Sequence, residues 1–327
     1  MKPSILIIAD FPNWAYHTIQ QFVASQLAQE FDIYSDFLIY NSKRKSKNPV
    51  KRIKMFFDKK KYQTLKKDAS YDVVVYLGFY FPELMNIKWA AKKTIRGVYT
   101  DSFPPQNLNF TGSVDEFKKQ YLKTTDALVC GSKKIKNDYI KLLKSTYFGS
   151  ADIGEKIFVP SCKEKDETKF TVGWTGNPRR KFKGYYTHIL PAVELAKKAY
   201  PDIEFKSRFS GAIETLPLFY EDVDVCVIAS DADAGPGLFS EASLMGVPCI
   251  STAIGIPNDV IKNRVNGFII EKDINQIAEH IIKLYEDRAL LKNMSLRIRK
   301  DYLAKYKSEI LTNDWRNMFN EVLDYNK

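Results

Sequence analysis

Residues 231–252 constrain the fold of this chain more than any other stretch. An apolar run, residues 223–229, precedes them and has the length and β-branched content of a buried parallel strand. The sequence Gly235-Pro236-Gly237 is then typical of a turn that opens a helix directly after the strand. Because open α/β sheets bind ligands at the carboxyl ends of their strands, this pattern predicts a parallel sheet with a ligand site at this loop.

The start of the expected helix is suited to bind an anion. The backbone N–H groups of Gly237, Leu238 and Phe239 are expected to lack partners within the helix, and the helix dipole adds positive potential. Glu241 lies one turn further along, where a carboxylate can accept hydrogen bonds from the vicinal hydroxyls of a sugar. Asp233 places a second carboxylate beside the same loop. The loop therefore favours a ligand that joins a diphosphate to a sugar.

This arrangement resembles the donor-sugar signature of the retaining family-4 glycosyltransferases of GT-B architecture. In that family an acidic residue precedes a Gly/Pro-rich turn, and a glutamate eight positions on is followed by Ala, Gly-x-Pro and a strand. Asp233 stands where the family usually has glutamate, whereas Glu241-Ala242 and Gly246-Val247-Pro248 match as they are. The match continues through residues 266–270, so it covers roughly the whole C-terminal half.

The resemblance implies an α/β fold of GT-B type: two Rossmann-like, doubly wound parallel-sheet domains that face a cleft. A length of 327 residues suits two α/β domains. We expect an acceptor-binding domain over residues 1–163 and a nucleotide-sugar-binding domain over residues 164–307. The polar run 161–168 is the expected linker. The terminal helix, residues 308–327, is expected to cross back to the first domain.

The N-terminal half alternates strand-like apolar runs with helical segments, which predicts a parallel sheet with helices on both faces. The expected strands are residues 5–9, 71–77, 94–99, 127–130 and 156–159. No Gly-x-Gly-x-x-Gly follows the first strand, which argues against a dinucleotide cofactor. We expect no cofactor; the nucleotide-diphosphate-sugar would be a co-substrate.

A basic loop opens the second half. Four of the five residues 179–183, in the loop after the expected strand 170–174, are Lys or Arg. Together these cations can neutralise a diphosphate. The loop resembles the family's Arg…Lys-Gly element, in which both cations hold the donor diphosphate. Lys183-Gly184 matches directly, and Arg180 is the expected arginine, with Arg179 as the alternative.

Two residues of the first half are candidate catalytic residues. His17 follows the loop after the first strand and could face the cleft; a capping or surface role is its alternative. Asp101 ends the strand 94–99, and a carboxylate at the carboxyl edge of a strand is well placed for a cleft. The resembled family often has a His-Asp pair there. In this chain Thr100 stands at the histidine position.

The positive charge is concentrated in residues 43–67. This segment holds twelve Lys/Arg and one acid, Asp58, so its charge of +11 equals the net charge of the whole chain. Apolar residues, Phe56 and Phe57 among them, lie between the cations. The pattern fits an anionic membrane surface, a nucleic acid backbone or a solvated lysine-rich loop. The residues expected to contact an anionic partner are Lys51, Arg52, Lys54, Lys59, Lys60 and Lys61.

Hydropathy and cysteine content point to a cytoplasmic protein. No stretch approaches 18 apolar residues, and the apolar run 4–9 is too short for a signal peptide. The cysteines are far apart in or beside apolar runs, as core thiols are: Cys130, Cys162, Cys226 and Cys249. If the basic segment binds lipid, the protein would be peripheral at the inner membrane face. Asp231-Ala232-Asp233 has the form of a metal motif, yet it lies where the resembled family binds sugar, so we expect no metal.

The expected function is a glycosyltransferase that moves a sugar from a nucleotide-diphosphate-sugar to an acceptor hydroxyl, with retention implied by the resemblance. Arg180, Lys183 and the helix start would stabilise the departing diphosphate. Glu241 would hold the ribose and Asp233 the transferred sugar. The expected acceptor is an envelope lipid or polysaccharide precursor. The alternatives are a DNA glycosyltransferase acting on a hydroxylated base, a non-catalytic sugar-nucleotide-binding protein and a nucleotide-sugar epimerase.

Overall fold

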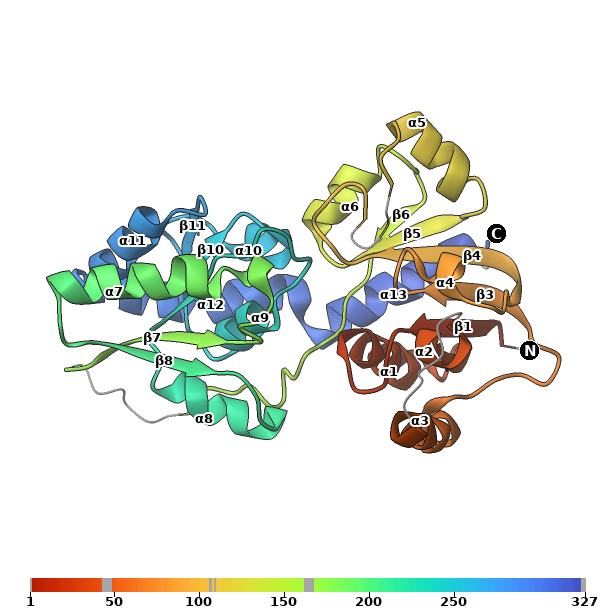
Figure 1. Ribbon diagram of the computed structural model, residues 1–327, viewed down its shortest axis with the longest axis horizontal. Coiled ribbons are helices and arrows are strands. Elements are labelled where there is room, and N and C mark those ends of the chain that lie inside the picture. Colours follow the sequence, from red (N-terminus) through yellow and green to blue (C-terminus); the bar gives the residue numbers. More distant parts are fainter. Residues whose placement is uncertain (1, 43–48, 106–107, 109, 162–167, 325–327) are drawn as a thin grey trace. The chain divides into compact units, whose positions relative to one another are not determined.

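The structure, a computed structural model, describes residues 2–42, 49–105, 108, 110–161 and 168–324. The chain divides into two units, Met1–Asp152 with Ser308–Lys327, and Ile153–Lys307. This division, between Asp152 and Ile153, lies N-terminal to the boundary after residue 163 that was expected from the sequence. Residues 162–167 of the expected linker lie outside the described residues. Figure 1 shows that each unit is a sheet with helices packed on it.

The sheet of the first unit has six parallel strands in the order β2-β1-β3-β4-β5-β6. Its strands are β1 (Ser4–Ala9), β2 (Asp32–Phe37), β3 (Ser70–Tyr76), β4 (Ala90–Val98), β5 (Ala127–Cys130) and β6 (Thr146–Phe148). The helices are α1 (Ala15–Leu27), α2 (Leu38–Asn41), α3 (Pro49–Tyr62), α4 (Phe81–Leu84), α5 (Val114–Phe117) and α6 (Lys133–Tyr139), with a π-helical turn at Lys118–Leu122. Every residue of β1 is buried, as expected for a central parallel strand.

The terminal helix α13 (Ser308–Val322) packs in the first unit, against α1 and β6. The indole N–H of Trp315 donates to the carbonyl oxygen of Ser150 at 2.8 Å, and the Trp315 side chain is fully buried. The rings of Phe319 and Phe31 lie edge to face with centroids 5.4 Å apart. The buried face of α13, which includes Trp315 and Phe319, is therefore a packing surface.

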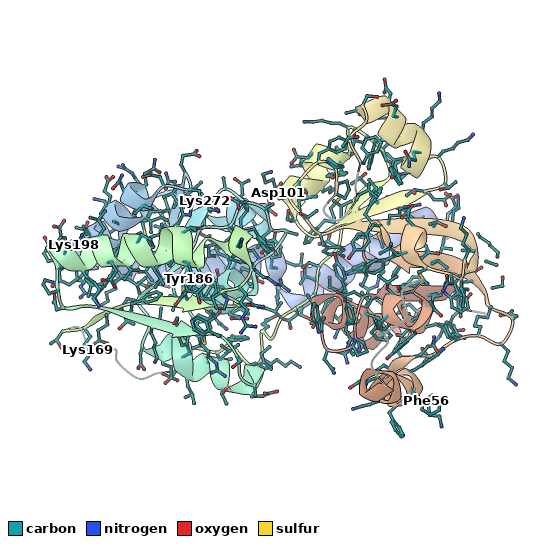
Figure 2. All side chains as sticks on the ribbon, in the orientation of Figure 1. Phe56, Asp101, Lys169, Tyr186, Lys198 and Lys272 are labelled. Carbon is teal, nitrogen blue, oxygen red and sulfur yellow. The ribbon has the colours of Figure 1, made fainter. Side chains whose placement is uncertain are left out.

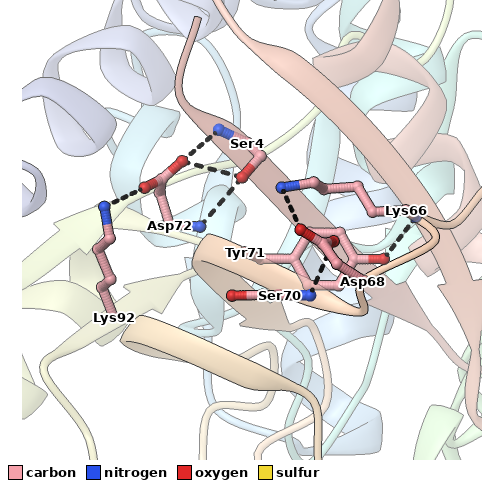
Figure 3. Close-up of polar contacts among 7 residues, drawn as sticks. All are labelled: Ser4, Lys66, Asp68, Ser70, Tyr71, Asp72 and Lys92. Carbon is pink, nitrogen blue, oxygen red and sulfur yellow. Dashed lines mark hydrogen bonds and ion pairs between the residues drawn. The ribbon is translucent and has the colours of Figure 1, made fainter. Parts of the chain in front are cut away.

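Asp72 joins three strands at the amino-terminal edge of this sheet (Figure 3). Its Oδ2 accepts hydrogen bonds from the backbone N and Oγ of Ser4 at 2.8 and 2.9 Å, and its Oδ1 pairs with Lys92 Nζ at 2.8 Å. Burial disfavours the charged carboxylate, but the bonds from Lys92 and Ser4 outweigh it and lower the pKa of Asp72 to about 2. These contacts hold β1, β3 and β4 in register.

The second unit has a five-stranded parallel sheet in the order β11-β10-β9-β7-β8. Its strands are β7 (Phe170–Thr175), β8 (Ile203–Arg208), β9 (Val225–Ile228), β10 (Cys249–Thr252) and β11 (Phe268–Ile270). The helices are α7 (Leu190–Ala199), α8 (Leu216–Glu221), α9 (Gly237–Leu244), α10 (Gly255–Val260), α11 (Ile274–Glu286) and α12 (Arg288–Tyr306). Helix α7 packs beside α11, while α9 and α10 pack against α12 (Figure 1). Two parallel sheets with covering helices confirm the predicted fold class.

One predicted strand was wrong. Residues 156–159 form a turn, in which the carbonyl of Gly154 accepts the N–H groups of Ile157 and Phe158, both at 2.8 Å. The apolar content of this segment serves packing instead, since Phe158 is fully buried beside Tyr220. Two strands of the first sheet were not expected from the sequence: β2, and β6, which is only three residues long.

Within the described residues, every helix is too short or too polar to span a lipid bilayer. Cys130, Cys226 and Cys249 are buried and form no disulfide, which confirms them as core thiols. Burial raises the pKa of the Cys130 thiol, so it stays protonated. Cys162 lies outside the described residues.

Candidate functional site

A cavity lies at the carboxyl ends of β7, β8 and β9 in the second unit. The end of β7, the loop after β8 and the start of α9 line it. Five residues singled out in the sequence are among the lining residues: Arg180, Lys183, Gly237, Leu238 and Glu241. The structure therefore gathers most of the expected donor residues at one place, at the edge of the sheet where α/β proteins bind ligands.

The basic wall of the cavity is a tight turn. Arg180 precedes a 3-10 turn (Lys181–Lys183), and Gly184 follows with a φ of +69°. A Cβ at Gly184 would lie 2.6 Å from the carbonyl oxygen of Ala229, so only glycine lets this turn approach the end of β9. The backbone N–H of Asp231 donates to the carbonyl oxygen of Phe182 at 2.9 Å. This bond joins the basic turn to the loop that leads to α9.

The start of α9 differs in one respect from the sequence prediction. Gly237 and Leu238 line the cavity, but the N–H of Phe239 donates to the carbonyl oxygen of Pro236 at 2.9 Å. The side chain of Phe239 is fully buried and packs near the ring of Tyr302. Because the chain closes its first turn on Pro236, the Phe239 N–H is not free for an anion, and the expectation for that residue was wrong.

Glu241 is held by two hydroxyl groups that the sequence analysis missed. Tyr220 OH donates to its Oε2 at 2.6 Å, and Thr175 Oγ1 lies 3.4 Å from the same oxygen. Burial raises the pKa of Glu241, while the bonds from Tyr220 and Thr175 and the charge of Arg208 oppose this rise. Among the described residues, Oε1 of Glu241 has no hydrogen-bond partner. One carboxylate oxygen is therefore fixed and the other is available to a ligand.

Arg208, at the end of β8, organises the loop on the far side of the cavity. Its guanidinium donates to the carbonyl oxygens of Ser210, Ala212 and Thr215 at 3.0, 3.1 and 2.9 Å. It also donates to the hydroxyl of Thr215 at 2.5 Å. Gly211 has a φ of +127°, and a Cβ there would lie 2.1 Å from Arg208 Nη2. Residues 209–211 line the cavity, so Arg208 shapes one of its walls.

Two ion pairs hold the loop that precedes α9. Lys183 Nζ contacts Asp233 Oδ2, and Lys272 Nζ contacts Asp231 Oδ1 at 2.6 Å. Lys272 belongs to the turn after β11 and is labelled in Figure 2. Both carboxylates of the Asp-x-Asp sequence are thus paired with lysines. The described part of the chain contains no group of three or more His, Cys, Asp or Glu placed to hold a metal ion.

The two candidate catalytic residues lie in the first unit in different surroundings. Asp101 (Figure 2) is largely buried, and its Oδ1 accepts a 2.7 Å hydrogen bond from Lys134 Nζ of α6. His17 is buried, and its Nδ1 accepts the N–H of Asn13 at 2.8 Å. The rings of Phe37 and Tyr62 each lie 5.1 Å from its ring. Because burial lowers the pKa of His17, it is neutral at neutral pH and supports the turn at Asn13.

The basic segment is described only in part. Lys43, Arg44, Lys45 and Lys47 lie outside the described residues, as do the side chains of Lys51, Arg52 and Lys54. Lys59, Lys60 and Lys61 are exposed on the last turn of α3. Phe56 and Phe57 on the same helix are 56% and 64% exposed, and Lys60 Nζ lies 4.9 Å from the centroid of the Phe56 ring. Figure 2 labels Phe56 on α3.

The far end of α3 is fixed to the first unit. Tyr62 packs against His17 and Phe37, and Gln63 Nε2 donates to the buried Asp36 Oδ1 at 2.6 Å. Burial raises the pKa of Asp36, with the bond from Gln63 acting against it. The last turn of α3, which carries the exposed Lys59, Lys60 and Lys61, is therefore held in place by Tyr62 and Gln63.

The sequence of the second unit is similar to those of known glycosyltransferases. Residues 195–301 match the family model described as glycosyl transferases group 1. The chain is 27% identical over 132 residues to N-acetyl-alpha-D-glucosaminyl L-malate synthase of Bacillus anthracis, covering 40% of this chain and 34% of that protein. It is 32% identical over 106 residues to the capsular polysaccharide biosynthesis glycosyltransferase CapM of Staphylococcus aureus, covering 32% and 28%. The matched region thus spans about a third of each relative.

The fold also matches a solved structure over nearly its whole length. The crystal structure of Anabaena HepE in complex with UDP superposes with a TM-score of 0.64 at 11% identity, covering 98% of this chain and 100% of that one. At this identity the likeness establishes the fold, which is the GT-B architecture. Together with the family model over residues 195–301, it confirms the resemblance to GT-B glycosyltransferases inferred from the sequence.

Proposed function

We propose that this chain is a glycosyltransferase that moves a sugar from a nucleotide-diphosphate-sugar to an acceptor hydroxyl with retention of configuration. The observation that carries the proposal is the cavity in which Arg180 and Lys183 line one wall and Gly237, Leu238 and Glu241 another. Cations and a helix start suit a diphosphate, and a carboxylate with one free oxygen suits vicinal hydroxyls.

In this proposal the cavity stabilises the leaving group. As the bond between the sugar and the diphosphate breaks, negative charge develops on the diphosphate oxygen. Lys183, Arg180 and the start of α9 would stabilise that charge in a partly enclosed site. Oε1 of Glu241 would accept hydrogen bonds from the ribose, and Asp233 would contact the transferred sugar.

The nucleobase would lie against the loop after β8. Residues 209–211 line the cavity, and Arg208 holds them in place. The HepE crystal structure contains UDP. We therefore propose a uridine nucleotide as the donor to test first.

The first unit would supply the acceptor site. Asp101, held by Lys134, is the candidate to contact the acceptor hydroxyl, and His17 would act through the turn at Asn13. CapM is named for capsular polysaccharide biosynthesis, which supports an envelope polysaccharide or lipid precursor as the acceptor. A membrane acceptor also fits α3, because exposed Phe56 and Phe57 beside Lys59–Lys61 suit an anionic lipid surface.

The test is a screen of nucleotide-sugars for binding and turnover, with the variant Lys183→Ala. We expect a donor to raise the melting temperature and Lys183→Ala to lower turnover by about 10²-fold or more, because a leaving-group contact is lost. Interconversion of donor epimers would identify an epimerase instead. Binding without turnover on any acceptor would identify a binding protein. Transfer to duplex DNA with hydroxylated bases would identify the DNA-modifying alternative.

A further inference from the structure

Of the cations that line the cavity, Lys183 is already paired with a carboxylate. Lys183 Nζ contacts Asp233 Oδ2, and the side chains are only 18% and 19% exposed. The second oxygen of Asp233 accepts the N–H of Gly235 at 3.2 Å, which holds the carboxylate in its loop. Because both side chains are largely buried, water screens this ion pair less than it screens a pair at the surface. Breaking the pair therefore changes the electrostatic energy of the site more than breaking a surface pair would.

The pair joins two walls of the cavity. Lys183 comes from the 3-10 turn, and Asp233 from the loop that continues into Pro236 and Gly237, both of which line the cavity. The backbone bond from Asp231 to Phe182 fixes these segments to each other. A ligand anion that pairs with the ammonium group of Lys183 must therefore come close to the Asp233 carboxylate, because the loop that carries Asp233 is held in place.

We propose that Asp233 is a specificity-determining residue that makes this cavity prefer a nucleoside diphosphate carrying a sugar over the free nucleoside diphosphate. The inference rests on the proposed function. A diphosphate that draws Lys183 away leaves the Asp233 carboxylate without its counter-ion and close to phosphate charge. An attached sugar compensates by donating its hydroxyl groups to that carboxylate. A free nucleoside diphosphate has no such donor and adds negative charge, so Asp233 promotes its release.

The same loop offers a matched control. Asp231 also pairs with a lysine, Lys272, at 2.6 Å, but Lys272 comes from the turn after β11. Asp231→Asn removes the same charge only two residues away. It therefore measures the general effect of one fewer carboxylate in the loop, without freeing Lys183.

The experiment measures dissociation constants by calorimetry for UDP and for the nucleotide-sugar found in the screen. The proteins are the full chain and its Asp233→Asn, Asp231→Asn and Lys183→Ala variants. We expect Asp233→Asn to bind UDP about tenfold more tightly and the nucleotide-sugar no more tightly, so the preference falls about tenfold or more. Asp231→Asn is expected to shift both constants by the same small factor. If Asp233→Asn does not fold, Asp233→Ser replaces it, since serine can also accept the Gly235 N–H.

Three results would overturn the inference. If Asp233→Asn binds UDP no more tightly than the unaltered chain while Lys183→Ala loses UDP, the cavity is the diphosphate site but Asp233 does not discriminate. If Asp231→Asn changes the preference as much as Asp233→Asn, the effect is general electrostatics. If Lys183→Ala binds UDP as well as the unaltered chain, the proposed function fails together with this inference.

Discussion

The hydroxyl of Tyr220 donates a 2.6 Å hydrogen bond to Oε2 of Glu241. The two residues come from α8 and α9, and the bond leaves Oε1 without a partner among the described residues. A partly buried carboxylate aimed by a buried hydroxyl is well suited to bind a sugar hydroxyl. The proposed role of Glu241 therefore depends on Tyr220.

Tyr220→Phe is expected to weaken donor binding about tenfold, because Glu241 loses its short hydrogen bond and its orientation. The KM for the donor should rise more than kcat falls. Steady-state kinetics over a range of donor concentrations measures both. The matched control is Tyr285→Phe, which removes a hydroxyl bonded to Asp202 at 2.5 Å in another part of the second unit. Equal effects of the two substitutions would argue against a role of Tyr220 in the site.

Arg208→Ala is expected to raise the donor KM about tenfold or more, because the loop 209–215 loses four hydrogen bonds. Arg208→Lys should recover little, since an ammonium cannot reproduce the planar fork of donors. Hydrogen exchange of the loop amides should rise in both variants. Lys206→Ala is the control, since Lys206 lies on the same strand and pairs with the exposed Asp222. Unchanged exchange in Arg208→Ala would contradict the proposed anchoring.

Much of the donor site could be predicted from the sequence because its residues lie in short, ordered motifs. Lys183 and Glu241 line the cavity, and Gly184 ends the basic turn beside it. Their positions follow from a strand, a glycine turn and a helix start, each of which is visible in the sequence. Tyr220, Thr175 and Arg208 were missed because each is a common residue type whose role depends on a partner brought near by folding. The error at Phe239 arose because the sequence does not reveal how the first turn of α9 closes on Pro236.

The stability of the first unit should depend on pH through Asp72. Its pKa is lowered to about 2, below its ordinary value of 3.8, so it stabilises the fold above pH 4 and this contribution is lost as the pH falls towards 2. After allowance for solvent screening we expect Asp72→Asn to lower the free energy of unfolding by about 1 kcal/mol at pH 7. Urea denaturation at pH 7 and pH 2 measures the difference. A difference that is as large at pH 2 as at pH 7 would show that the charge of Asp72 is not the cause.

The exposed side chains in the last turns of α3 should bind anionic membranes. Replacing Lys59, Lys60 and Lys61 by Gln is expected to weaken binding to vesicles with anionic lipid about 100-fold, at roughly 1 kcal/mol per lysine. Sedimentation with vesicles in a salt series measures this. The control replaces Lys169, Lys197 and Lys198 of the second unit by Gln, and Figure 2 labels two of these lysines.

The aromatic residues separate lipid from nucleic acid as the partner of α3. Phe56→Ser with Phe57→Ser should weaken vesicle binding because both rings are exposed and available to enter a lipid surface. Binding to duplex DNA would depend on the lysines and much less on these rings. Tighter binding to DNA than to anionic vesicles at the same salt concentration would favour the nucleic acid alternative.

A crystal structure of the protein with UDP or GDP tests the central claim most directly, namely that the second unit holds the donor diphosphate in this cavity. We predict that the diphosphate oxygens lie about 3 Å from Lys183 Nζ and from the backbone N–H groups of Gly237 and Leu238. The ribose hydroxyls should lie at the same distance from Oε1 of Glu241. A nucleotide bound outside the cavity lined by Lys183 and Glu241 would contradict the claim.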